Sequence, residues 1–220
     1  MASISYDIAH LLNGIVLLFS FALLYQRRLF GVILAFAMQA MVLAAAAAWQ
    51  AYVHDAPHLY ITAALALGFK ALIIPVVLHR IIVLFGIHRT IETALGIGMS
   101  MIAGASLVAL SIMLVLPVTA MAAGITRENL ATALSVVLLG LLTMITRRNA
   151  ITQVVGFMSM ENGLILAAVG VEGMPLVVEM SIAFSIMVAF IIFGVFFFHI
   201  RERFDTLDLR YLETFRGERR

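Results

Sequence analysis

The sequence contains no cysteine among its 220 residues. This absence excludes disulfide bridges, thiolate metal sites, iron–sulfur clusters and a cysteine nucleophile. The histidines and acidic residues show no spacing typical of metal ligands, and neither a phosphate-binding loop nor a nucleophile constellation is present. The sequence therefore predicts no metal, no cofactor and no catalytic centre of its own, and any redox chemistry must belong to a partner.

Charge is also scarce. Charged residues make up 12% of the chain and hydrophobic residues 64%, with a mean hydropathy of +1.11. Soluble domains carry about a quarter charged residues. Residues 201–220 hold 11 of the 26 charges, so the preceding chain cannot build a solvated surface. The chain has slightly more basic than acidic residues. This excess does not indicate a nucleic-acid binder, because Lys70 is the one lysine and the arginines fall mostly in predicted loops. Lipid must be the solvent for most of this chain.

The apolar residues fall into stretches long enough to cross a bilayer, whose core of about 30 Å needs about 20 helical residues. Seven such stretches predict an all-α, polytopic membrane helix bundle. A further apolar segment, Ile81–Ile87, is too short to span and either extends the third helix or lies at the interface. The predicted spans are Ile4–Tyr25, Leu29–Val53, His58–Arg80, Ala94–Ala122, Leu130–Ile145, Ile151–Val171 and Met174–His199.

The arginines predict the orientation of this bundle. With seven spans, twelve arginines fall on one side of the membrane and only Arg127 on the other. Cytoplasmic loops carry the excess of Lys and Arg. The C-terminus is therefore predicted to be cytoplasmic and the N-terminus to face outward.

Three charged residues stand out because they lie away from the ends of predicted spans: Lys70, Glu161 and Glu179. Each costs about 2.5–3.5 kcal/mol at the bilayer centre. A low-dielectric site favours the neutral form of a carboxylate. If the two glutamates have no permanent counter-charge, we therefore expect them to form a proton relay, with the lysine as a charge partner. The alternative is a fixed ion pair or hydrogen bond that only orders the bundle. The two glutamates differ in predicted depth by roughly 9 Å. This difference favours two successive sites on one proton path over a pair of carboxylates that share one proton.

Uncharged polar residues accompany these charges. Pro75 cannot donate to the carbonyl of Ala71, so a kink there frees a carbonyl beside Lys70. That arrangement fits either a hydrated ion path or ordinary packing. Interhelical hydrogen bonding is the expected role of Asn13, Gln39, Gln153 and Asn162.

The tail, residues 201–220, carries apolar side chains at helical spacing with charges between them. It predicts either a helix resting on the membrane surface or, preferably, one that docks onto a cytoplasmic partner subunit. These apolar residues are Phe204, Leu207, Tyr211 and Phe215.

Three features of Ser135–Gly217 resemble the K subunit of bacterial complex I. They are the turn Arg147-Arg-Asn149, the span Gly156-Phe-Met-Ser-Met-Glu161-Asn-Gly-Leu-Ile-Leu-Ala, and the string Glu179-Met-Ser-Ile-Ala, followed by an apolar run and the tail. With its additional N-terminal spans, the whole chain is similar to the E component of hydrogenase-4 and related group-4 membrane-bound hydrogenases.

This resemblance implies three regions: a four-helix N-terminal membrane extension (1–130), a three-helix K-like core (131–200) and a cytoplasmic amphipathic tail (201–220). It implies a non-catalytic subunit of a complex I-like assembly in a bacterial inner membrane, with antiporter-like membrane subunits and a cytoplasmic redox module as partners. Glu161 and Glu179 match the family's two proton-path glutamates, whereas Lys70 lies in the extension. Two alternatives are a subunit of a multisubunit cation/proton antiporter and a purely structural membrane anchor.

Overall fold

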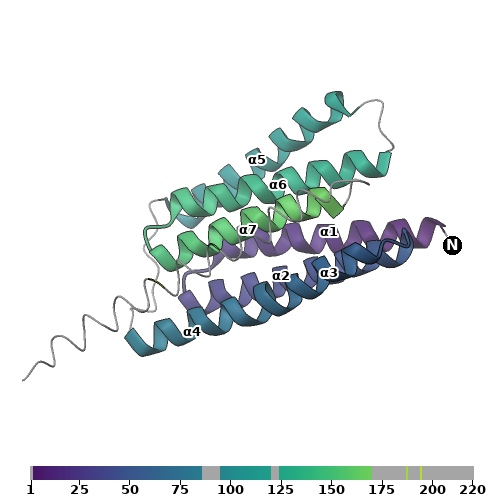
Figure 1. Ribbon diagram of the computed structural model, residues 1–220. Coiled ribbons are helices and arrows are strands. Elements are labelled where there is room, and N and C mark those ends of the chain that lie inside the picture. The colour runs from purple at the N-terminus through teal and green to yellow at the C-terminus, as the bar shows by residue number, and fades with distance from the viewer. Residues whose placement is uncertain (1, 86–94, 120–123, 170–186, 188–193, 195–220) are drawn as a thin grey trace, which may run out of the picture. The chain divides into compact units, whose positions relative to one another are not determined.

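The computed structural model describes residues 2–85, 95–119, 124–169, 187 and 194. Apart from the last two, these residues belong to one compact unit, residues 1–185, and all of their elements are helices (Figure 1). The helices are α1 (Ala2–Tyr25), α2 (Leu29–Val53), α3 (Pro57–Leu65), the π-helical segment η1 (Ala66–Ile73), α4 (Ile74–Phe85), α5 (Ile97–Val118), α6 (Gly124–Thr146) and α7 (Ala150–Val169).

Six helices of the described part are long and apolar enough to cross a membrane. They confirm an all-helical fold with membrane-spanning character, and they correspond to the first six predicted spans. The seventh predicted span, Met174–His199, and the tail lie outside the described residues.

Short turns make neighbouring helices antiparallel. Three residues join α1 to α2, and α2 ends where the backbone N–H of His54 bonds the carbonyl of Gln50. Asp55 follows with a φ of 49°, in the left-handed region, and Pro57 begins the next helix at a position where its missing N–H costs nothing. The chain therefore reverses within a few residues and packs α2 against both neighbours.

The segments α3, η1 and α4 follow one another without a break, from Pro57 to Phe85. Within η1 the turns are widened, and the N–H of Ile74 bonds the carbonyl of Phe69, five residues back. A proline ring clashes with the carbonyl four residues earlier, and the wider turn before Pro75 accommodates it. The helix continues past the predicted end at Arg80 to Phe85, so the structure supports the alternative in which the short apolar segment extends the third helix.

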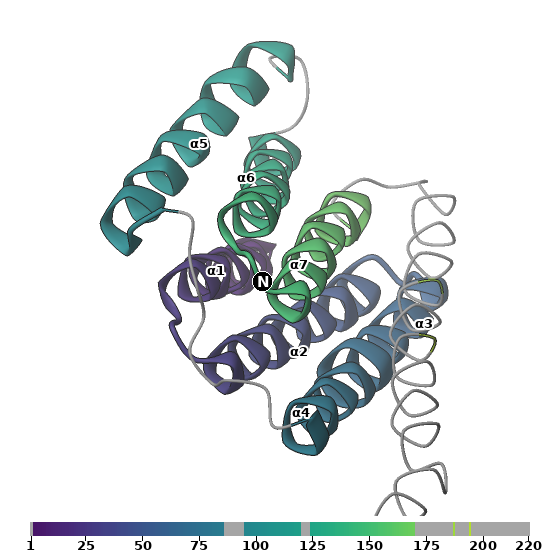
Figure 2. The ribbon, with the colours of Figure 1, turned by 90° about the vertical axis from the view of Figure 1, so that its left-hand side faces the viewer.

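The contacts give the order of the helices in the bundle. The helix α1 packs on α2 and α6, while α2 also contacts α7 and the α3–η1–α4 helix. The helix α5 lies on one side, against α6 and α1, and α3 and α4 lie on the other (Figure 2). Large apolar side chains of α5, such as Met99, Ile102 and Met113, are exposed, as expected for a helix that faces acyl chains.

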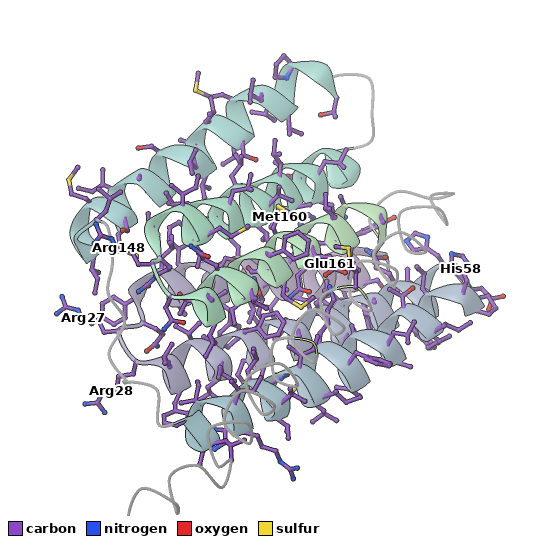
Figure 3. All side chains as sticks on the ribbon, turned by 60° about the vertical axis from the view of Figure 1, so that its left-hand side comes forward. Arg27, Arg28, His58, Arg148, Met160 and Glu161 are labelled. Carbon is purple, nitrogen blue, oxygen red and sulfur yellow. The ribbon has the colours of Figure 1, made fainter. Side chains whose placement is uncertain are left out.

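The two ends of the bundle differ in charge. Arg27 and Arg28, in the turn after α1, lie at the same end as Arg148, in the turn after α6, while His58 lies at the other end (Figure 3). We call these the arginine end and the opposite end.

The helices α6 and α7 approach each other most closely through glycines. A Cβ atom at Gly140 would lie 2.5 Å from the backbone nitrogen of Met160, and one at Gly163 would lie 2.8 Å from the backbone nitrogen of Val137. On the α7 side, Gly156 meets the backbone of Met144 in the same way. Small residues let membrane helices pack backbone to backbone, so these glycines fix α7 against α6.

We therefore predict that Gly140→Ala destabilises the bundle, because the new methyl group meets backbone atoms that cannot move aside. Overpacking of this kind costs about 1–3 kcal/mol. The matched control is Gly14→Ala in α1, where no atom lies within 4 Å of the added carbon. Thermal unfolding in detergent should show a lower midpoint for Gly140→Ala and an unchanged or higher midpoint for Gly14→Ala. Equal midpoints would contradict the close crossing.

Candidate functional site

A buried ion pair joins the π-helical segment to α7. Lys70 Nζ lies 3.1 Å from Glu161 Oε1, and both side chains are almost completely buried, with 3% and 2% exposed. Figure 3 shows Glu161 between the two ends of the bundle. Two of the three charges predicted to be proton-relay residues are thus in direct contact. The third, Glu179, lies outside the described residues.

This contact corrects one expectation. Glu161 was expected to lie without a permanent counter-charge, and the structure places the chain's sole lysine beside it. The physical reason is the cost of an isolated charge: removing it from water costs several kcal/mol, whereas a close pair recovers much of that cost. Proton exchange at this site must therefore begin from a salt bridge.

The local structure of each helix positions the pair. On α7, Gly156 and Gly163 face α6, and Glu161 lies roughly 140–200° around the helix from them, since successive residues are about 100° apart. The glutamate therefore points away from α6. On the other side of the contact, Lys70 lies within η1, the widened segment before Pro75. Such π segments occur frequently at functional sites.

A chain of hydrogen bonds continues from Lys70 into the bundle. Lys70 Nζ donates to Asn162 Oδ1 at 3.0 Å, and Asn162 Nδ2 donates to Gln39 Oε1 at 3.2 Å. Gln39 Nε2 donates to Ser20 Oγ at 2.7 Å and to Ser159 Oγ at 3.0 Å. We call Asn162, Gln39, Ser159 and Ser20 the polar ladder. The prediction that Gln39 and Asn162 form interhelical hydrogen bonds is confirmed.

The charge on Lys70 sets the direction of every bond in the ladder. An ammonium group has only donors, so Asn162 must present its oxygen to Lys70 and its NH₂ group to Gln39. Gln39 then has its NH₂ group left for the two serines. The ladder thus holds Lys70 as a donor, and it ties together α1, α2, η1 and α7.

Beyond the ladder, toward the opposite end, lies a cluster of buried aliphatic side chains, and the buried polar side chains of Gln50, Thr62 and Ser135 lie at the same level. On α1, α2 and α7 these aliphatic residues lie farther from the arginine end than the ladder residue of the same helix, as Leu43 lies beyond Gln39 and Ile165 beyond Asn162. We call this cluster the apolar layer. It consists of Val16, Leu43, Ala47, Ala51, Leu59, Ala63, Ala133, Val136, Ile165, Leu166 and Val169.

Two smaller polar contacts join α1 to α6 at the opposite end. Asn13 Nδ2 donates to Asn129 Oδ1 at 2.7 Å, which confirms interhelical bonding for Asn13 as well. His10 Nδ1 lies 3.3 Å from Glu128 Oε2, and the two side chains are 35% and 67% exposed. No cluster of three metal-ligating side chains occurs within the described ranges.

At the arginine end, the buried Arg147 caps α1. Its Nη2 donates to the carbonyls of Leu23 and Leu24, at 3.0 and 2.7 Å, where helical carbonyls lack backbone partners. Burial lowers the pKa of this guanidinium from its usual value. Gln153 Nε2 in turn donates to the carbonyl of Arg147, in the turn before its own helix α7. The prediction of an interhelical hydrogen bond is therefore wrong for Gln153.

Sequence reasoning offered Lys70 as a charge partner and a fixed ion pair as an alternative, but it did not say which glutamate the lysine contacts, and it missed the two serines of the ladder. One signal was available for the contact: Lys70 lies ten residues before Arg80, and Glu161 lies thirteen residues after Arg148. Similar distances from arginines of the same end place the two charges at similar depths. For Ser20 and Ser159 no comparable signal exists, because serines are common in membrane helices without such partners.

We predict strong energetic coupling between Lys70 and Glu161. Glu161→Gln leaves a buried ammonium group without its counter-charge, and Lys70→Met leaves a buried carboxylate, so each single variant should lose about 3–5 kcal/mol of stability. The double variant should lose much less than the sum of the two. A double-mutant cycle of unfolding free energies in detergent measures this coupling.

The matched control is the partly exposed pair of His10 and Glu128 at the opposite end. His10→Gln and Glu128→Gln should change stability by at most about 1 kcal/mol each, because solvent screens that pair. Additive effects at Lys70 and Glu161 would contradict the buried contact.

Comparison with known proteins finds one protein that is similar to part of this chain. The uncharacterized protein Rv0085 of Mycobacterium tuberculosis (strain ATCC 25618 / H37Rv) is 29% identical over 152 residues, which cover 68% of this chain and 69% of that protein. No protein-family model matches the chain. No solved structure matches it either.

Proposed function

We propose that the chain is a non-catalytic membrane subunit of a complex I-like, hydrogenase-type oxidoreductase assembly, and that Lys70 and Glu161 take part in proton translocation there. The observation that carries the proposal is the buried ion pair inside a bundle of helices that are long and apolar enough to cross a membrane. Intramembrane ionisable groups are expensive and mark ion or proton pathways more often than ordinary packing.

The pair can exchange a proton without creating a net charge. When the proton of the Lys70 ammonium group passes to Glu161, both side chains become neutral, and the reverse transfer restores the ion pair. In a low-dielectric site the balance between these forms responds strongly to any charge brought nearby. A charge that arrives in a neighbouring subunit can therefore change the proton affinity of Glu161.

The orientation belongs to the same proposal. The arginine end carries Arg27, Arg28 and Arg148, and under the positive-inside rule it faces the cytoplasm. The first residue of α1 then lies outside, and the C-terminus becomes cytoplasmic if a seventh span follows α7. We place the chain in a bacterial inner membrane, with its tail docked onto a cytoplasmic redox module.

The resemblance to the complex I K subunit supports this assignment of partners. Glu161 stands within the string that carries that resemblance, and it is also the acidic member of the buried pair. Glu179 remains the predicted second proton-path residue. A cation/proton antiporter with the same K-like core differs from this proposal in its partners and lacks a redox module.

A structural anchor is the second candidate function, and one observation favours it. The salt bridge is direct, at 3.1 Å, and the ladder continues it with hydrogen bonds across four segments. A permanent ion pair and hydrogen-bond network that only holds the helices together would have this same geometry. The two functions differ in whether Glu161 must titrate.

We predict that Glu161→Gln lowers proton translocation by the assembled complex at least tenfold, because the amide keeps the shape of the side chain but does not titrate. Proton uptake is measured in sealed vesicles, together with electron transfer and the amount of assembled complex. Pumping at the normal rate by an assembled Glu161→Gln complex would overturn the relay. If the double variant Glu161→Gln with Lys70→Met assembles and pumps normally, the pair is a structural anchor and not a proton relay.

The partners are tested by purification of the complex in mild detergent. The proposal predicts co-purification with antiporter-like membrane subunits and with a metal-containing, hydrogenase-like module. Antiporter-like subunits alone would favour the cation/proton antiporter.

A further inference from the structure

We infer that Arg27, Arg28 and Arg148 form one binding site for the phosphate of an anionic phospholipid at the arginine end of the bundle. Arg147 is the positioning residue of this site, because it joins the two turns that carry the three arginines. The inference goes beyond the proposed function and does not depend on proton transfer. It follows from the charge of this end, the contact between the two turns and the apolar surface beside them.

The described residues of the arginine end carry positive charge without acidic partners. Its arginines are Arg27, Arg28, Arg80, Arg147 and Arg148. Of the described carboxylates, Glu161 lies between the two ends of the bundle, and the others lie toward the opposite end, namely Asp7, Asp55 and Glu128. The described part of the chain therefore leaves this end for an external anion to neutralise, and arginine binds phosphate with strong, often bidentate hydrogen bonds.

The turn between α1 and α2 is joined to the turn between α6 and α7. Arg147 Nη2 donates to the carbonyls of Leu23 and Leu24, so the second turn lies against the end of α1. Arg28 and Arg147 are also the two described residues in an isolated β-bridge, which places the backbones of the two turns side by side. The three exposed arginines of the site therefore project from adjacent turns at one end of the bundle (Figure 3).

Arg147 adds a positive charge that its own contacts do not neutralise. Its side chain is buried, and Nη1 has no hydrogen-bond partner within the described residues. The two carbonyls that Nη2 contacts carry only partial negative charge, and a buried cation is costly without an opposite charge nearby. A phosphate held by the exposed arginines would supply that charge from the adjacent surface, without touching the buried Nη1.

The position of the site favours a phospholipid over an acidic protein. The span Ile4–Tyr25 has 22 residues and is therefore about 33 Å long, which is enough to cross a hydrocarbon core of about 30 Å. Arg27 follows two residues later, at the level of the lipid headgroups. Tyr25 and Ile145, just before the arginines on α1 and α6, are 62% and 76% exposed. Tyrosine is typical of the membrane interface, and Ile145 can contact acyl chains, so a phospholipid fits both the charged and the apolar part of this surface.

The test measures which lipid the full-length chain retains. The chain is reconstituted into vesicles of phosphatidylglycerol and phosphatidylcholine in equal amounts and extracted into mild detergent, and the bound lipids are counted by native mass spectrometry. Both lipids contain a phosphate, but only phosphatidylglycerol has a net negative charge. Inorganic phosphate is then added as a competitor, which separates a lipid site from a site for free phosphate.

We expect the chain to retain phosphatidylglycerol in preference to phosphatidylcholine and to keep it in the presence of inorganic phosphate. Arg27→Gln and Arg148→Gln should each lower this preference about fivefold, the usual contribution of one arginine near an anionic membrane surface. The matched control is Arg80→Gln, which removes the same exposed charge at the same end but from α4, outside the two joined turns, and should leave the preference nearly unchanged. Arg147→Lys keeps the charge but cannot reproduce the guanidinium contacts, and it should also lower the preference.

Equal losses in Arg27→Gln, Arg148→Gln and Arg80→Gln would show a diffuse attraction to the whole end and overturn the site. Equal retention of the two lipids, or release of the lipid by inorganic phosphate, would contradict a phospholipid as the ligand. If the chain retains no anionic lipid when it is purified with its partner subunits, the surface is a protein interface and the inference is wrong. An unchanged preference in Arg147→Lys would exclude the positioning role of Arg147.

Discussion

A charge inside a lipid bilayer must be neutralised within the protein, and among the described residues the contact between Lys70 and Glu161 meets that requirement. Lys70 comes from the N-terminal region, and Glu161 comes from the region that resembles the complex I K subunit. The pair therefore binds the two regions to each other electrostatically, and the ladder through Asn162 and Gln39 extends this attachment to α1 and α2. The same contact explains why the fold retains its only lysine at such a depth.

The two partners are held by helices of different character. On one side, α7 is fixed against α6 by glycines whose replacement would bring carbon into contact with backbone atoms. On the other, Lys70 lies in a π-helical segment next to a proline, where the backbone hydrogen bonds are already non-standard. Glu161 thus lies on a rigid helix, and Lys70 lies on an irregular one. This difference suits a site in which the charge contact must form and break, whereas a permanent structural ion pair does not need one rigid and one irregular helix.

The spans could be predicted because placing a charge in lipid costs free energy. This cost restricts which residues a span can contain, and the composition of each stretch shows it directly. Hydropathy located six helices of the described part and placed Lys70 and Glu161 near mid-span. It could not show that they touch, because a one-dimensional pattern gives depth along each helix but not which faces meet. The premise of an uncompensated glutamate failed for this reason: the counter-charge lay 91 residues earlier in the chain. The π segment was foreseen only as a kink at Pro75, and the capping by Arg147 was not foreseen at all.

The most direct test of this account is a solid-state NMR measurement of the side chain of Lys70. Because the chain has one lysine, ¹⁵Nζ labelling gives a single side-chain resonance in membranes. The account predicts a resonance with a measurable dipolar coupling to one glutamate carboxyl carbon, and Glu161→Ala should abolish that coupling. A lysine nitrogen without a nearby carboxyl carbon, or with a coupling that persists in Glu161→Ala, would contradict the central claim.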